Sequence, residues 1–121
     1  MNILVVDDEP DTRLFVITEY YKSLFPNELI VLEHSYTLPQ FIGGFDVVSL
    51  DNDLGEFGDV VREIDKVTFV GYPDVVIHSM NPIAAKSIML KLLDRDENFK
   101  NVWMYKYSDM VKYLKMVGQE N

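Results

Sequence analysis

The sequence predicts an α/β fold with a parallel five-stranded sheet and helices on both faces. Five short apolar or β-branched runs alternate with segments of helical periodicity along the 121 residues. The run at residues 2–6 is apolar and ends abruptly at Asp7, which indicates a strand buried on both faces. Strand–helix alternation within one short chain favours parallel pairing, because parallel strands need a crossover between them.

Each expected element follows from a local pattern. Strands are predicted at residues 2–6, 28–33, 45–50, 74–77 and 101–105. Helices are predicted from Pro10 to about residue 25, weakly at 37–42, at 59–66, from Pro82 to about residue 92, and from Ser108 or Asp109 onward.

Prolines and an asparagine mark the helix boundaries. Pro10 and Pro82 suit the first position of a helix, where the missing N–H has no partner to lose. Asn81 directly precedes Pro82 and is expected to cap that helix. Trp103 and the tyrosines at 105 and 107 are expected to pack with the last strand and its surroundings.

The composition limits the class of protein. The net charge of −9, from 20 acidic and 11 basic residues, argues against general DNA binding, which needs a basic surface. There is no cysteine, and no apolar run approaches the roughly 20 residues that span a bilayer. We therefore expect one stand-alone domain, residues 1–121, in the cytoplasm of a bacterium or of a virus-infected host, away from membranes.

Polar residues follow four of the five strands. In a flavodoxin-like strand order, 2-1-3-4-5, ligands bind beyond the carboxyl ends of the strands where the order reverses. The residues at these ends are Asp7 and Asp8, then Asp51 and Asp53, then His78, Ser79 and Asn81, and finally Lys106.

The acids of this set predict a metal site. Carboxylates packed closely cannot all ionise without a cation between them. Mg²⁺ or Mn²⁺ suits oxygen ligands and also recruits phosphate oxygens. We therefore expect Asp7, Asp8, Asp51 and Asp53 to bind a divalent metal for phosphoryl chemistry.

Single residues also have plain structural explanations. One aspartate at a strand end is often a cap or a turn residue, and Asn81 is first of all a helix cap. His78 is either a packed histidine hydrogen-bonded to backbone or a general acid or base. His34 and Ser35, at the flank of the sheet, are expected on the surface.

Several motifs resemble the response-regulator (CheY-like) receiver domain. They are Ile3 to Pro10 (ILVVDDEP), Asp46 to Asp51 (DVVSLD), Ser79 and Lys106. The resemblance implies that Asp51 accepts a phosphoryl group, as in phosphorelay or two-component signalling, and that Ser79 and Lys106 bind its oxygens. It also implies Mg²⁺ ligation by Asp8 and Asp51, by Asp7 through water, and by the Asp53 carbonyl. The implied partners are a histidine kinase or small phosphodonor and a downstream protein.

The chain departs from the usual receiver pattern at three places. Tyr107 follows Lys106 where receivers usually have proline, and Gly55 stands where proline is usual. Few residues remain after Ser108, so the last helix is expected to be short.

Two further strings resemble a receiver-derived group proposed to process cyclic phosphates. They are Leu50 to Gly55 (LDNDLG) and His78 to Pro82 (HSMNP). This resemblance implies a metal-dependent phosphoesterase of the RNA-repair type that uses His78, with Asn81 near the phosphate. Its substrate would be a phosphate-ended RNA or nucleotide. A degenerate receiver used only as a scaffold is the third hypothesis.

Overall fold

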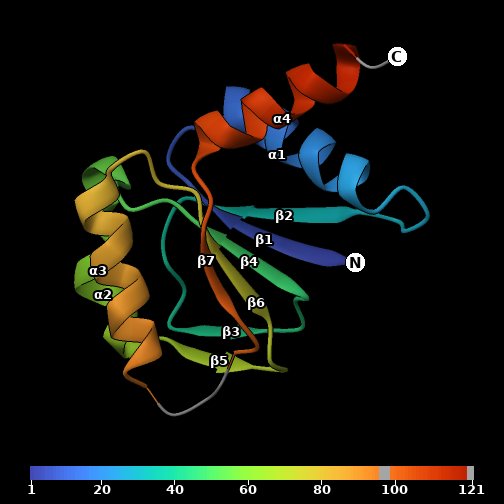
Figure 1. Ribbon diagram of the computed structural model, residues 1–121. Coiled ribbons are helices and arrows are strands. Elements are labelled where there is room, and N and C mark those ends of the chain that lie inside the picture. The colour runs from blue at the N-terminus through green and yellow to red at the C-terminus, as the bar shows by residue number, and fades with distance from the viewer. Residues whose placement is uncertain (96–98, 120–121) are drawn as a thin grey trace.

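The apolar runs form one parallel sheet at the centre of the protein. We analysed a computed structural model, which describes residues 1–95 and 99–119. The large sheet contains β1 (Asn2–Val6), β2 (Val31–Ser35), β4 (Val47–Leu50), β6 (Asp74–Ile77) and β7 (Val102–Met104). Its strand order is β2-β1-β4-β6-β7, and all neighbouring pairs are parallel (Figure 1). The α/β class and the parallel five-stranded sheet are confirmed.

Two short strands were not expected. β3 (Phe41–Gly43) and β5 (Thr68–Val70) pair in parallel and form a separate two-stranded sheet. The weak helix predicted at 37–42 is therefore wrong. The central residues of the two strands, Ile42 and Phe69, are buried, and their neighbours are more exposed, which is the alternation of a strand. The labels of the large sheet differ from the predicted order 2-1-3-4-5 because β3 and β5 interrupt the count along the chain.

Helices cover both faces of the large sheet. α1 (Pro10–Leu24) and α4 (Tyr107–Gln119) lie on one face, and α2 (Val60–Glu63) and α3 (Pro82–Leu93) lie on the other (Figure 1). Two short 3₁₀ helices complete the set, η1 (Gly55–Phe57) and η2 (Ile64–Lys66). The helix predicted at 59–66 is thus divided into α2 and η2.

The strands divide their side chains between two cores. In β1, Leu4 and Val6 pack toward α2 and α3, whereas Ile3 and Val5 pack toward α1 and α4. Burial on both faces explains why this strand is apolar without alternation. The α1 side is completed by Ile17, Tyr21, Val47, Val76 and Met110.

The predicted cap of α3 is confirmed. Asn81 Oδ1 accepts a hydrogen bond from the Ala84 N–H at 3.1 Å, and Pro82 follows at the first helical position. None of the helices in residues 1–95 and 99–119 has the length and apolarity that a membrane crossing requires.

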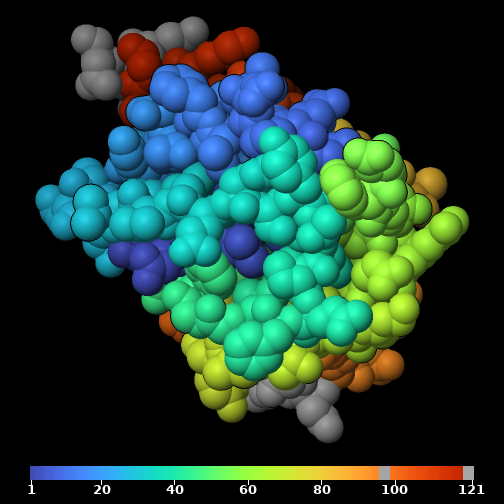
Figure 2. All heavy atoms as spheres, turned by 180° about the vertical axis from the view of Figure 1, so that it is seen from behind, coloured from blue at the N-terminus to red at the C-terminus, as the bar shows by residue number. Residues whose placement is uncertain are grey.

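The connection after β2 leads from the large sheet to the separate pair of strands. Seen from behind, the cyan-to-teal segment that leads from β2 toward β3 lies between α1 above and the green η1–α2 region at the side (Figure 2).

Candidate metal centre

The alternation of side chains brings three polar residues to one face of the sheet. Asp7 follows Val5 by two residues, and Val5 faces the α1 side. Ser49 lies opposite Val5 in the register of β1 and β4, and it neighbours Val76 in β6. His78 follows Val76 by two residues, so Asp7, Ser49 and His78 all point toward α1.

His78 connects Asp7 and Ser49 through its two ring nitrogens. Nε2 lies 2.7 Å from Asp7 Oδ2, and Nδ1 lies 2.7 Å from Ser49 Oγ. All three side chains are fully buried. Because an ionised carboxylate can only accept, the ring donates to Asp7 through Nε2. His78 is thus a packed histidine, but its ring nitrogens are hydrogen-bonded to side chains and not to the backbone.

Asp7 is held as a buried carboxylate. Burial by itself would raise its pKa, but the hydrogen bonds from His78 and from the Glu9 N–H, together with the charge of Arg13, hold the pKa below its ordinary value. His34, which was expected on the surface, is half-buried, and its Nε2 lies 2.8 Å from the Asp7 backbone oxygen.

Arg13 is the cation of the site, and the sequence analysis did not identify it. Its Nη1 lies 2.9 Å from Asp51 Oδ2 and 3.3 Å from each carboxylate oxygen of Asp7. Nη2 lies 3.4 Å from Glu9 Oε2, and the guanidinium stands 5.5 Å from the ring centre of Tyr107. The available signal was its place in the first turns of the helix that starts at Pro10, directly after the acidic strand end.

Asp51 is buried at the end of β4. Its Oδ1 accepts the Asn52 N–H at 2.8 Å, and its Oδ2 accepts from Arg13. Burial raises the pKa of Asp51; the charge of His78 opposes this rise, and the nearby Asp7 adds to it. Asp7 and Asp51 therefore shift in opposite directions, and Asp51 is the carboxylate whose charge is less well compensated.

An acidic cavity of about 340 Å³ opens beside these residues. We call it the acidic cavity; its walls include Asp8, Asp51, Asp53, Arg13, Ser79 and Asn81. It combines acids from the ends of β1 and β4 with polar residues that follow β6. The predicted acids Asp8, Asp51 and Asp53 are thus brought together, and Asp7 and His78 lie behind the cavity wall.

Asp8 and its neighbours concentrate negative charge in this cavity. Burial and the nearby charges of Asp7, Asp53 and Glu9 raise the pKa of Asp8. A Cβ on Gly55 would lie 3.3 Å from Asp8 Oδ2, and Gly55 has a φ of +60°. Glycine is therefore favoured at this position, because a side chain would crowd Asp8 and would be strained in the left-handed backbone conformation.

Within residues 1–95 and 99–119, one group of side chains lies close enough together to hold a metal ion, and it differs from the predicted set of four acids. Ligand atoms of Asp7, Asp51 and His78 lie within 4.8 Å of one another, which is close enough for a metal ion. The same atoms are engaged by Arg13 and by the Asp7–His78 hydrogen bond. The predicted acids Asp8, Asp51 and Asp53 line the acidic cavity, but in the described residues they do not form a group whose ligand atoms lie within that distance of one another. Oxygen ligands alone would fit Mg²⁺ better than a set that includes imidazole.

Of the two predicted phosphoryl-binding residues, Ser79 lines the acidic cavity and Lys106 does not. Ser79 is buried, its Oγ accepts the Asn81 N–H at 3.1 Å, and it lines the acidic cavity. Lys106 is exposed and lines a neighbouring cavity, which it shares with Ser79, Lys86 and Asp109. Lys106 is therefore not among the residues that line the acidic cavity.

The residue after Lys106 has a structural role. The Tyr107 N–H donates to the His78 carbonyl oxygen at 3.0 Å. Proline, usual in receivers at this position, has no N–H to donate. Tyr107 thus ties the start of α4 to the end of β6 and places its ring beside Arg13.

Comparison with known proteins adds no family to this description. The chain matches no protein-family model, and no curated protein matches it by sequence.

Proposed function

We propose that this chain is a receiver-like domain that accepts a phosphoryl group on Asp51 with the help of Mg²⁺ or Mn²⁺. The observation that carries the proposal is the position of Asp51 in the acidic cavity. The same cavity is lined by Asp8 and Asp53, whose oxygens suit a hard metal ion, and by the polar residues Ser79 and Asn81. The parallel sheet, with helices on both faces and β1 beside β4, is consistent with a flavodoxin-like domain of the receiver type.

In this proposal each residue has a defined role. An Asp51 oxygen forms a bond to phosphorus, and the bond between phosphorus and the donor's leaving group breaks. Asp8, Asp51 and the Asp53 carbonyl would hold the metal, which when bound would neutralise charge on the phosphoryl oxygens. Ser79 donates to a phosphoryl oxygen, and exposed Lys106 moves toward the cavity to bind another.

The signalling output follows from the new charge. A phosphoryl group on Asp51 replaces the Asp51 carboxylate as an anionic partner for Arg13 and attracts Lys106 from the neighbouring cavity. The segment that begins α4 then shifts, and a downstream protein detects the change. The donor in this proposal is a histidine kinase or a small phosphodonor.

The test is phosphorylation by acetyl phosphate in the presence of Mg²⁺. We expect the intact mass of the wild type to rise by one phosphoryl group, and we expect no such rise in Asp51→Asn or in the presence of EDTA. Glu33→Gln, an exposed acid of β2, is the matched control and should be modified like the wild type. An adduct that persists in Asp51→Asn would contradict the assignment of the acceptor.

Metal binding is tested separately by thermal melting. A ligand that binds only the folded state raises its stability. We expect Mg²⁺ to raise the melting temperature of the wild type. Coincident melting curves with and without Mg²⁺ would exclude the metal site.

A metal-dependent phosphoesterase is the second candidate. It is favoured by Arg13, Ser79 and Asn81, which line the same cavity and could bind a phosphate oxygen. His78 is fully buried, and both of its ring nitrogens have partners, so in this candidate it acts on Asp7 and not on the substrate. Hydrolysis of a 2′,3′-cyclic phosphate end by the wild type, lost in His78→Ala, would favour this candidate over the receiver.

A further inference from the structure

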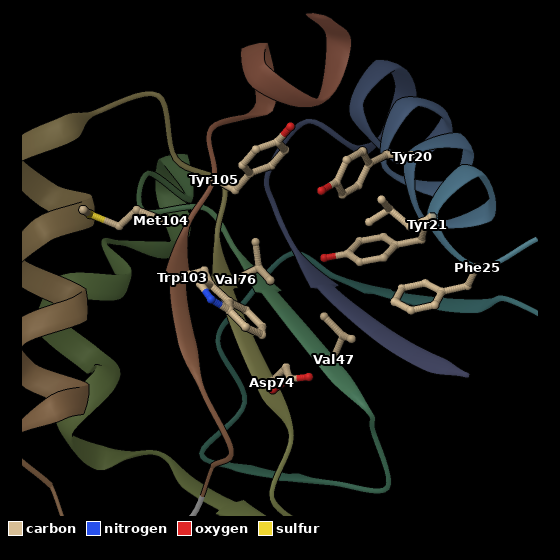
Figure 3. A pocket seen from close by; sticks show the side chains of 10 residues that line it. Tyr20, Tyr21, Phe25, Val47, Asp74, Val76, Trp103, Met104 and Tyr105 are labelled. Carbon is tan, nitrogen blue, oxygen red and sulfur yellow. The ribbon is translucent and has the colours of Figure 1, made fainter. Parts of the chain in front are cut away.

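A second cavity lies on the α1 side of the sheet and shares no residue with the acidic cavity. Its volume is about 320 Å³, and it lies between the end of α1 and the strands β4, β6 and β7. Figure 1 shows α4 lying along α1, so that the lower part of the strands has no helix over it on this face. We call this hollow the aromatic cavity, and Figure 3 shows it from close by.

Half of the residues that line it are aromatic. Tyr20 stacks on Tyr105 with ring centres 5.3 Å apart, and Tyr21 meets Tyr20 edge to face at 5.2 Å. Phe25 and Trp103 complete the walls, and Trp103 is 49% exposed. Aromatic faces of this kind attract cations and planar rings.

One hydroxyl in this wall has no partner. Tyr21 is only 4% exposed, and its Oη is the one buried side-chain N or O atom without a hydrogen bond in residues 1–95 and 99–119. Tyr21 lines the aromatic cavity, and its oxygen points toward the strands across it (Figure 3). A buried polar group without a partner is unfavourable, so this oxygen indicates that something else supplies the partner.

A carboxylate lies in the same cavity. Asp74 begins β6, is half-buried, and lines the cavity with its side chain below Trp103 and beside Val47 in the view of Figure 3. Its Oδ1 accepts a hydrogen bond from Asn101 Nδ2 at 3.2 Å. No ion pair of Asp74 occurs within the described parts of the chain, so its charge is available to a cation.

We propose that the aromatic cavity binds a small aromatic cation, such as an aryl amidine or an arylalkyl amine. Its ring would lie among the tyrosines and Trp103, and its N–H groups would donate to the Asp74 carboxylate and to Tyr21 Oη. The volume suits a ligand of this size, and an apolar hollow with few polar groups is the usual form of such sites. The net charge of −9 also favours a cationic ligand over an anionic one.

The protein carries its own probe for this test. Trp103 is the one tryptophan of the sequence and forms part of the wall, so its fluorescence reports on occupancy of the cavity. Benzamidine, neutral benzamide and anionic benzoate share one shape and differ in charge. We expect a saturable fluorescence change with benzamidine, a weaker one with benzamide and none with benzoate.

Two variants separate the roles of the polar groups. Asp74→Asn should weaken benzamidine binding about tenfold or more, because it removes a charged acceptor. Glu33→Gln removes the same charge from an exposed position of β2 and should bind like the wild type. Tyr21→Phe should weaken binding and also raise the melting temperature of the ligand-free protein, because it deletes an unsatisfied hydroxyl. A residue that served only the packing would not give this opposed pair of effects.

Several outcomes would overturn the proposal. They are no saturable change with benzamidine in the millimolar range, equal binding of benzoate, or equal affinities of Asp74→Asn and Glu33→Gln. A concentration-dependent dimer in sedimentation experiments, lost on replacing Trp103, would assign the cavity to a second copy of the chain instead.

Discussion

Arg13 Nη1 lies 2.9 Å from Asp51 Oδ2, and the same nitrogen lies 3.3 Å from both carboxylate oxygens of Asp7. One guanidinium nitrogen thus bridges the two buried acids. Arg13 neutralises negative charge that a divalent metal could also neutralise. Arg13 and a divalent metal ion would therefore compete for the carboxylates of Asp7 and Asp51.

Arg13→Ala should destabilise the protein when metal is absent. Breaking a buried ion pair costs about 3 to 5 kcal/mol, and the 20% exposure of the Arg13 side chain reduces our expectation to about 2 kcal/mol. Urea unfolding in EDTA measures this loss. Arg62→Ala is the control, because that side chain is 80% exposed and its removal should cost less than about 1 kcal/mol.

Mg²⁺ should stabilise Arg13→Ala more than it stabilises the wild type. Without the guanidinium, the carboxylates of Asp7 and Asp51 have more negative charge to offer a metal ion. The measurement is the Mg²⁺-dependent shift in melting temperature of each protein. A smaller shift in Arg13→Ala would mean that Arg13 helps to bind the metal and does not compete with it.

His78→Ala should destabilise the protein by about 3 kcal/mol. The substitution leaves a cavity and removes the hydrogen-bond partner of the buried Asp7 carboxylate. Ser49→Ala removes the partner of His78 Nδ1 alone and should cost about 1 to 2 kcal/mol. Chemical denaturation compares the two. If His78→Ala kept wild-type stability, the structural role assigned to this histidine would be rejected.

Relative to the wild type, the metal-free Asp51→Asn variant should become more stable as the pH rises. Because the folded state raises the pKa of Asp51 above 3.8, it binds the proton more tightly than the unfolded state does. The contribution of Asp51 is therefore complete below pH 3.8 and is lost as the pH rises through the folded-state pKa. The free energy of unfolding of Asp51→Asn, minus that of the wild type, should increase across this window.

Asp7→Asn should show the opposite pH dependence of its stability difference from the wild type. The folded state lowers the pKa of Asp7, so the stability that this carboxylate contributes is present above pH 3.8 and is lost as the pH falls through its folded-state pKa. Asp7→Asn should therefore be less stable than the wild type at neutral pH, and the difference should shrink in acid. Equal signs for the two variants would contradict the opposed pKa shifts.

Asn81→Ala should lower the free energy of unfolding by about 1 kcal/mol, because it removes the cap of α3. Asn81→Ser keeps a capping oxygen and should recover most of that loss. Thermal melting of both variants measures the cap. If Asn81→Ser melts like Asn81→Ala, the side chain stabilises the protein by another contact.

The local sequence determined the general fold and the acids that line the acidic cavity. Apolar runs that end at acids specify buried parallel strands, and Asn81-Pro82 specifies a helix start, because these signals need only neighbouring residues. The same reasoning placed Asp8, Asp51 and Asp53 at one edge of the sheet, where they line one cavity. The strands β3 and β5 could not be predicted from local patterns, because each is only three residues long and pairs with the other across the chain.

Only the tertiary structure decided how the charges of the site are balanced. Arg13 reaches Asp51 across 38 positions of the chain, and His78 reaches Asp7 across 71, so no local pattern encodes either contact. Only the tertiary structure likewise shows that Lys106 lines a different cavity from the acidic one, and that α4, lying along α1, leaves the aromatic cavity without a helix over it. Sequence periodicity fixes which face a side chain occupies, whereas the contacts it makes depend on strand register and helix placement, which arise from packing of the whole chain.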